Sequence, residues 1–397
     1  MFSKERNLRG DPVVGVSPEL LKWCRATVGL STADVATMLK RNQSEVEAWE
    51  TGAEAPTYPQ LEKLAYEIYK RPLAIFFLPS PPEESQPQSE FRTLPESDMR
   101  SLSRDTYLHI RRAHSYQIAL QELFDGKNPT DRLIWQSLKL SVSEPAAPQA
   151  QEVREFLSVS IEQQTKWRSS ETALKEWRKA VEAAGIFVFK APFKQKEISG
   201  FCLADQQLPV IYLNNGTTKT RQSFSLMHEL AHLLFSVNGL SKFDSLYVSK
   251  LPAREMRLEQ FCNAIAAEIL IPSEDFSIQL RKFPADAERV SDDQFADLAS
   301  RYGVSREAVL RRFLDRGMVG PEFYARKAEL WASQKKASGG GNWYLNQGAY
   351  LSSRFASEVV SRRYRNQISL EQAADYLGIK PKHFAGFEGR LLEGAVS

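Results

Sequence analysis

Between Ser225 and Phe235 the chain reads SLMHELAHLLF, and this stretch sets narrower limits on the fold than any other. Its leucines recur every three to four residues, which predicts an amphipathic helix with one buried face. His228 and His232 are four residues apart, so their rings project from one face of that helix, and Glu229 lies beside them. This is the H-E-x-x-H pattern of a zinc site with a carboxylate next to the reactive water. The alternative is an ordinary amphipathic helix with two partly exposed histidines.

A zinc hydrolase usually has a third protein ligand and a fourth position left open for water. The next helical pattern runs from Arg254 to Pro272 and offers Glu259 as that ligand. Asn263 lies one turn further along the same face, where its amide can hydrogen-bond the ligating carboxylate. The same segment holds three alternative ligands, Glu255, Cys262 and Glu268. We expect the two glutamates to face solvent and the thiol to pack.

The two motifs together resemble the ImmA/IrrE family of metallopeptidases. The resemblance is carried by His-Glu-Leu-Ala-His-Leu-Leu at 228–234 and by the segment from Glu259 through Asn263 to Pro272, and it covers about residues 185–320. It implies that His228, His232 and Glu259 bind Zn²⁺ and that Glu229 is the general base. It also implies an endopeptidase that regulates gene expression by cleaving a repressor or antitoxin protein in a prokaryotic stress-response or mobile-element setting.

In such a mechanism zinc polarises the substrate carbonyl and lowers the pKa of a water to about 7. Glu229 takes a proton from the water and passes it to the departing amine. Tyr212 and Tyr247 are conceivable donors to the oxyanion, although tyrosines near a core usually serve packing.

Three short runs of β-forming residues precede the histidine helix, at 185–190, 199–203 and 209–214. Helical patterns dominate elsewhere, so we predict an α+β fold that is mostly helical. A small sheet that leads directly into the zinc helix is the plan of a zincin-like peptidase domain. An exposed edge strand beside the metal could hold an extended peptide by strand addition, and the sequence does not show which strand is the edge.

Residues 16–82 contain four short helical patterns, separated at Gly29-Leu30-Ser31, at Asn42 and at Gly52. Together with Pro56-Thr57, these features resemble the XRE (lambda-repressor-like) helix-turn-helix family. The resemblance implies an all-α recognition domain over residues 1–82.

The third helical pattern of this domain begins at Gln43. In helix-turn-helix proteins the start of this helix meets DNA, so Gln43 and Ser44 are the candidate base readers. Glu45 and Glu47 lie on the same helix and would be repelled by phosphates, and the domain has about equal numbers of basic and acidic residues. Docking of a protein, or dimerisation, is therefore the alternative to DNA binding.

Beyond this domain we predict a helical connector at 83–150, the peptidase domain at 151–335 and a C-terminal helical segment at 342–397. Two further helix-turn-helix-like patterns lie near 295–313 and 368–384. The resemblance to the ImmA/IrrE family implies that the pattern near 295–313 belongs to the peptidase fold. The C-terminal segment carries Arg354, Arg362, Arg363 and Arg365, a candidate surface for a partner or nucleic acid.

The net charge of +3 gives no strong sign of nucleic-acid binding by the whole chain. Three scattered cysteines form no disulfide framework, which suits a reducing cytoplasm. We find neither a signal peptide nor an apolar run of membrane-spanning length, so we expect a cytoplasmic protein. The rival to a peptidase is a DNA-binding regulator or antitoxin whose zinc site is structural or inactive. The oligomeric state stays open.

Overall fold

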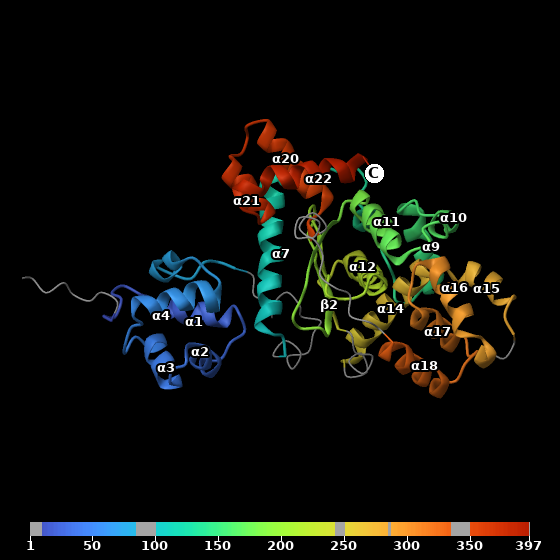
Figure 1. The fold of residues 1–397 in the computed structure, drawn as a ribbon, viewed down its shortest axis with the longest axis horizontal. Helices are drawn as coiled ribbons and strands as arrows, with labels where there is room; N and C mark the ends of the chain where they lie inside the picture. The colour runs from blue at the N-terminus through green and yellow to red at the C-terminus, as the bar shows by residue number, and fades with distance from the viewer. Residues whose placement is uncertain (1–9, 85–100, 243–250, 285–286, 335–349, 397) are drawn as a thin grey trace, which may run out of the picture. The chain divides into compact units, whose positions relative to one another are not determined.

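The computed structural model describes residues 10–84, 101–242, 251–284, 287–334 and 350–396 (Figure 1). The chain divides into two compact units, Met1–Arg112 and Ala113–Ser397. Helix α7 (Arg104–Leu123) belongs to the first unit up to Arg112 and to the second from Ala113. The finer division into four segments stays a prediction. None of the described helices is long and apolar enough to cross a bilayer.

The first unit is all helical, in the order that the sequence predicts. Ser31 caps the second helix through a reciprocal bond with Asp34, and Gly52 ends the third helix in the left-handed conformation (φ 79°). Buried Leu21, Val46 and Trp49 contribute to one core. The elements are α1 (Pro18–Ala26), α2 (Thr32–Leu39), α3 (Gln43–Thr51), α4 (Tyr58–Glu62), a π-helix η1 (Lys63–Tyr69) and a 3-10 helix η2 (Leu73–Phe77).

The second unit is built on a mixed four-stranded sheet in the order β1-β3-β2-β4. Strands β1 and β3 are parallel, whereas β2 is antiparallel to both β3 and β4. The bounds are β1 (Phe187–Ala191), β2 (Ile198–Leu203), β3 (Val210–Asn214) and β4 (Leu240–Lys242). The three predicted strands are confirmed. The fourth, which follows the histidine helix, was not predicted.

Helices make up the rest of this unit, which confirms the mostly helical α+β class. They are α8 (Ile134–Ser137), α9 (Ala146–Phe156), α10 (Ile161–Gln164), α11 (Ser170–Ala183), α12 (Lys219–Leu234), α14 (Ala253–Leu270), α15 (Ser273–Leu280), η3 (Ala287–Arg289), α16 (Asp292–Tyr302), α17 (Arg306–Asp315), α18 (Pro321–Ser333), α20 (Ser353–Tyr364), α21 (Leu370–Leu377), η4 (Pro381–His383) and α22 (Phe384–Val396).

Helix α12, which carries the two histidines, lies in the interior. It packs against β2 and β3 on one side and against α11 and α14 on the others. Every residue from Ser225 to Leu234 is buried. The leucines and Met227 join the main core of the unit, in which Cys202 and Ile211 of the sheet also lie. Polar side chains on this helix are therefore removed from water and need polar partners or an ion.

The opposite face of the sheet is aromatic. Tyr116, from the second half of α7, stacks on Phe189 of β1 with ring centroids 4.0 Å apart. Phe355 of α20 lies edge-on to both rings. Figure 1 shows the sheet between α7 and α12. The connector and the C-terminal segment thus cover the face of the sheet that α12 leaves open.

Candidate metal centre

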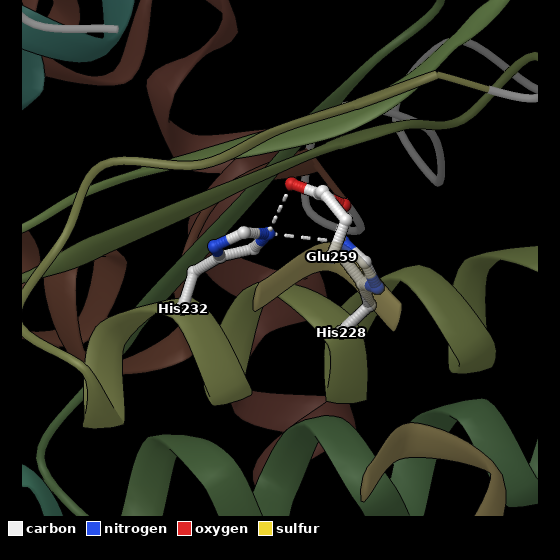
Figure 2. Close-up of side chains that lie close together, drawn as sticks. All are labelled: His228, His232 and Glu259. Carbon is white, nitrogen blue, oxygen red and sulfur yellow. Dashed lines mark hydrogen bonds and ion pairs between the residues drawn. The ribbon is translucent and has the colours of Figure 1, made fainter. Parts of the chain in front are cut away.

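Three side chains converge where α12 crosses α14 (Figure 2). The Nε2 atoms of His228 and His232 are 3.0 Å apart. The Glu259 carboxylate places Oε2 3.3 Å from Nε2 of His228 and Oε1 3.1 Å from Nε2 of His232. All three side chains are buried. The helical spacing of four residues aligns the histidines, and the packing of α14 against α12 brings the carboxylate to them.

The donor set and its spacing fit a zinc ion. Tetrahedral zinc with bonds of about 2.0–2.1 Å to nitrogen and oxygen separates its ligand atoms by about 3.3 Å. The three separations given above are within a few tenths of an ångström of that value. Within the described part of the chain, the Nδ1 atoms of His228 and His232 are buried and have no hydrogen-bond partner. The spacing of the donor atoms, and not an outer hydrogen bond, therefore supports a metal here. If both Nε2 atoms carried lone pairs, they would repel each other and the Glu259 carboxylate. A proton or a cation between these atoms removes that repulsion.

The charges of Glu259 and the two histidines shift one another's pKa values. Burial would raise the pKa of Glu259, but the two imidazoles lower it well below its usual range. Burial lowers the pKa of His232, whereas Cys262 and Glu259 raise it, and the net direction is upward. Without a metal, these directions favour an ionised Glu259 beside a protonated His232. A zinc ion would take the place of that proton.

Glu229 lies next to this group but is not part of it, since only His228, His232 and Glu259 have donor atoms within 4.8 Å of one another in the described chain. Its side chain is fully buried. A Cβ built on Gly239 would be 2.9 Å from Oε2 of Glu229, so this backbone touches the carboxylate. The Gly239 N–H also donates to Sγ of Cys202 (3.2 Å). Glu229 thus lies close to the ring of His232, and its role as a general base stays a prediction.

The other residues of α14 have different surroundings. Asn263 is half-buried, and no bond to Glu259 is found among the described residues, so its outer role stays a prediction. Cys262 is buried in the core and is not among the grouped ligands; burial raises the pKa of its thiol. Glu255 is half-buried. The solvent-facing position expected for Glu268 is wrong, because its carboxylate is buried and accepts from Arg312 (2.6 Å).

Tyr212 does not face the candidate site. It lies on β3 between Ile211 and Leu213, both of which point into the core around α12. Its own ring therefore points to the opposite face, where it stacks on Phe201 at 5.2 Å. Its role is packing. Tyr247 lies outside the described residues.

Gln43 and Ser44 stand at the start of α3, as expected, and both are exposed. The amide of Gln43 donates to Glu47 (2.7 Å) and to Thr32 (3.1 Å). Glu45 accepts from Gln60 (3.0 Å). The polar groups at this end of the helix are therefore engaged with one another, and a role in reading bases stays a prediction.

Cys202 and Gly239 are the neighbours of the site that sequence reasoning missed. Gly239 follows the histidine helix by a short connection and begins the pairing with β2, where Cys202 N donates to Gly239 O (2.9 Å). The sequence signal for this contact was a glycine shortly after the helix of His228 and His232. Its significance could not be recognised because strand β4, which positions Gly239, was not predicted.

Comparison with known proteins agrees with this geometry over part of the chain. Residues 181–314 match the profile of the Peptidase_M78 family, described as the IrrE N-terminal-like domain. The matched segment includes the sheet, both helices of the candidate centre and the helix pair α16–α17. No curated protein matches the chain. Over about a third of its length, the chain is similar to the Peptidase_M78 metallopeptidase family.

Proposed function

We propose that this protein is a zinc-dependent endopeptidase that regulates gene expression by cleaving a repressor or antitoxin protein. One observation carries the proposal: His228, His232 and Glu259 bring three buried donor atoms to one point with zinc-like spacing, and Glu229 lies beside them. The similarity of residues 181–314 to Peptidase_M78 supports it.

Each residue of the proposed site has a separate chemical role. His228 and His232 would supply neutral nitrogen ligands, and Glu259 an ionised oxygen, so the site keeps one charge to offset the cation. When bound, zinc supplies Lewis acidity that activates a water and a peptide carbonyl. Glu229 accepts the proton of the attacking water at its carboxylate and returns it to the amine that leaves. The main core packed around α12 fixes the direction of these groups.

The proposed substrate is an extended segment that pairs with β4. The outer edge of β1 is occupied, because Arg178 donates to Val188 O (2.8 Å) and to Leu351 O. On β4, no further strand pairs with the outer edge among the described residues. This strand begins directly after Gly239, which touches His232 and Glu229. A peptide added here by main-chain pairing would pass beside the candidate centre.

We propose that the helices of residues 16–82 serve recognition, of DNA or of a protein. The bonds of Gln43, Glu45 and Glu47 to neighbouring side chains favour a protein. The second candidate function is a DNA-binding regulator whose zinc site is structural or inactive. The full burial of Glu229 and His232 favours it, because structural zinc sites are closed.

The substitution Glu229→Gln distinguishes the peptidase from the DNA-binding regulator. Glu229→Gln keeps the size of the side chain and leaves the ligands in place, so zinc content and folding should stay unchanged. Proteomic comparison of cells with wild-type and variant protein should show one target cut only by the wild type. Affinity capture with the variant should retain that uncut target.

The matched control is Glu274→Gln, the same change at an exposed position on α15, outside both helices of the candidate centre. It should cleave like the wild type. Cleavage that persists in Glu229→Gln would rule out the proposed mechanism. A downstream response that persists while no target is cut by the wild type would favour the structural zinc site.

A further inference from the structure

Two helix-turn-helix segments in this chain share one register. Ser31 and Ser369 each form a capping box, and the next helix begins twelve residues later, at Gln43 and at Pro381. The first helix has eight residues in both and ends on a left-handed residue, Lys40 or Gly378. The buried positions also correspond: Val35, Ala36, Leu39, Val46 and Trp49 match Ala373, Ala374, Leu377, Phe384 and Phe387. The start of the second helix therefore has the same place on each segment.

The two segments differ in the charged side chains at the start of the second helix. In the first segment, Glu47 is exposed and Glu45 is partly exposed, and Gln43 bonds Glu47. In the second segment, the positions of Asn42 and Ser44 are taken by Lys380 and Lys382. Both lysines are exposed, and among the described residues neither side chain has a hydrogen bond or an ion pair. The positions of Glu45 and Glu47 are taken by His383 and Ala385. The helix start therefore carries two acids in the first segment and two lysines in the second.

A third segment, α16–α17, has a similar turn with Gly303 in the left-handed conformation, but its cations are used within the fold. Arg306 stacks over Trp331 at 4.8 Å and donates to Gln334. Arg312 pairs with buried Glu268. Two arginines of the C-terminal segment outside the turn are also engaged: Arg354 with Thr130, and Arg362 with Glu358 and Leu123 O. Lys380 and Lys382 are not held in this way.

We propose that the C-terminal segment binds the phosphate backbone of double-stranded DNA through Lys380 and Lys382. In helix-turn-helix proteins, the start of the second helix faces the duplex. Unpaired lysines there gain by releasing counterions from phosphates. The next exposed positions of α22 are Ala385, Gly386 and Gly389, which allow close approach but carry no side-chain donor for a base. Binding is therefore independent of sequence.

The number of lysines that contact phosphates determines the expected affinity for DNA. The segment contributes two exposed lysines, and it also carries an exposed acid, Glu371, at the start of α21. Binding should lie in the range of non-specific complexes, with a Kd of about 10⁻⁴ to 10⁻⁶ M at physiological salt. Because each neutralised phosphate contributes about 0.9 to the slope of log K against log salt, two contacts predict a slope of about −2.

The test measures binding of the full chain to a short fluorescent duplex of random sequence by anisotropy, over a range of salt concentrations. Lys380→Glu/Lys382→Glu should weaken binding by about tenfold or more and reduce the salt slope by about two. Both side chains are exposed, and Lys380→Gln/Lys382→Gln gives a milder change in the same direction. The peptidase need not be active for any of these measurements.

Two control variants make the result specific. Lys139→Glu/Lys166→Glu changes the net charge equally at exposed sites elsewhere in the second unit and should retain the salt slope. Gln43→Ala/Ser44→Ala changes the candidate base readers of the first segment and should lose less affinity than the C-terminal pair. The proposal is overturned if the wild type does not bind duplex at low salt, or if either control loses as much affinity as the C-terminal pair.

Discussion

The backbone of Gly239 lies against the imidazole ring of His232. A Cβ built on Gly239 would stand 2.5 Å from Cγ and Cδ2 of that ring and 2.9 Å from Oε2 of Glu229. Real Cβ atoms do not come so close, so an alanine here must displace the ring, the carboxylate or the strand. The backbone directly before β4 therefore limits the positions of a candidate ligand and of the candidate base at the same time.

Gly239→Ala should damage the metal site more than the fold. Overpacking of this kind costs about 1–3 kcal/mol, and a displaced His232 should weaken zinc binding by about tenfold or more. The measurement is zinc affinity by competition with a chelator, together with thermal unfolding of the metal-free protein. Gly320→Ala is the control, because no atom lies within 4 Å of its added Cβ. Equal zinc affinity in both variants would show that the ring is free to move.

Lys190 gives a prediction about stability and pH. It is buried on β1, and burial, followed by the charges of Arg178 and Lys219, lowers its pKa to about 7. In the unfolded chain the pKa is about 10.4. Between these values the unfolded state binds more protons than the native state, so the free energy of unfolding should rise as the pH rises from about 7 to about 10.

Lys190→Met removes this titration and should flatten the rise. Below pH 7, where the native protein holds a buried charge, the variant should be more stable than the wild type by a few kcal/mol. Urea unfolding at several pH values measures both effects. The exposed Lys196→Met should follow the wild-type profile. A profile of Lys190→Met with the wild-type slope would mean that another group is responsible.

Arg312 and Glu268 form a buried ion pair that joins α17 to the end of α14. Their closest atoms are 2.6 Å apart, and Ser273 Oγ also donates to the carboxylate (2.7 Å). Arg312→Met leaves a buried carboxylate without its cation, which should cost about 3–5 kcal/mol. Adding Glu268→Gln should recover part of the loss.

The urea midpoint reports this change, and zinc content per folded chain should not move. Arg311→Met is the control on the same helix, because Arg311 pairs with Asp315 on the surface, where such pairs contribute at most about 1 kcal/mol. A loss in Arg312→Met no larger than in Arg311→Met would contradict the assigned role of the pair.

The helix of His228 and His232 could be predicted because periodic leucines and a fixed spacing of four are local properties of the sequence. Glu259 could be proposed as a ligand from a second local helical pattern, on the assumption that the two helices pack together. Local rules do not predict strand β4, which has three residues and exists through pairing with β2. Nor could they place Tyr116 on Phe189, or Glu268 on Arg312, since both contacts join residues far apart in the chain.

The metal content of the purified protein tests the central claim most directly. Protein prepared without chelators should contain about one zinc per chain, measured by elemental analysis, and His232→Ala and Glu259→Ala should lose it while the first unit stays folded. Removing zinc from the wild type should lower its unfolding temperature. A folded protein without a bound transition metal would contradict the account, as would full zinc retention after His228, His232 and Glu259 are replaced together.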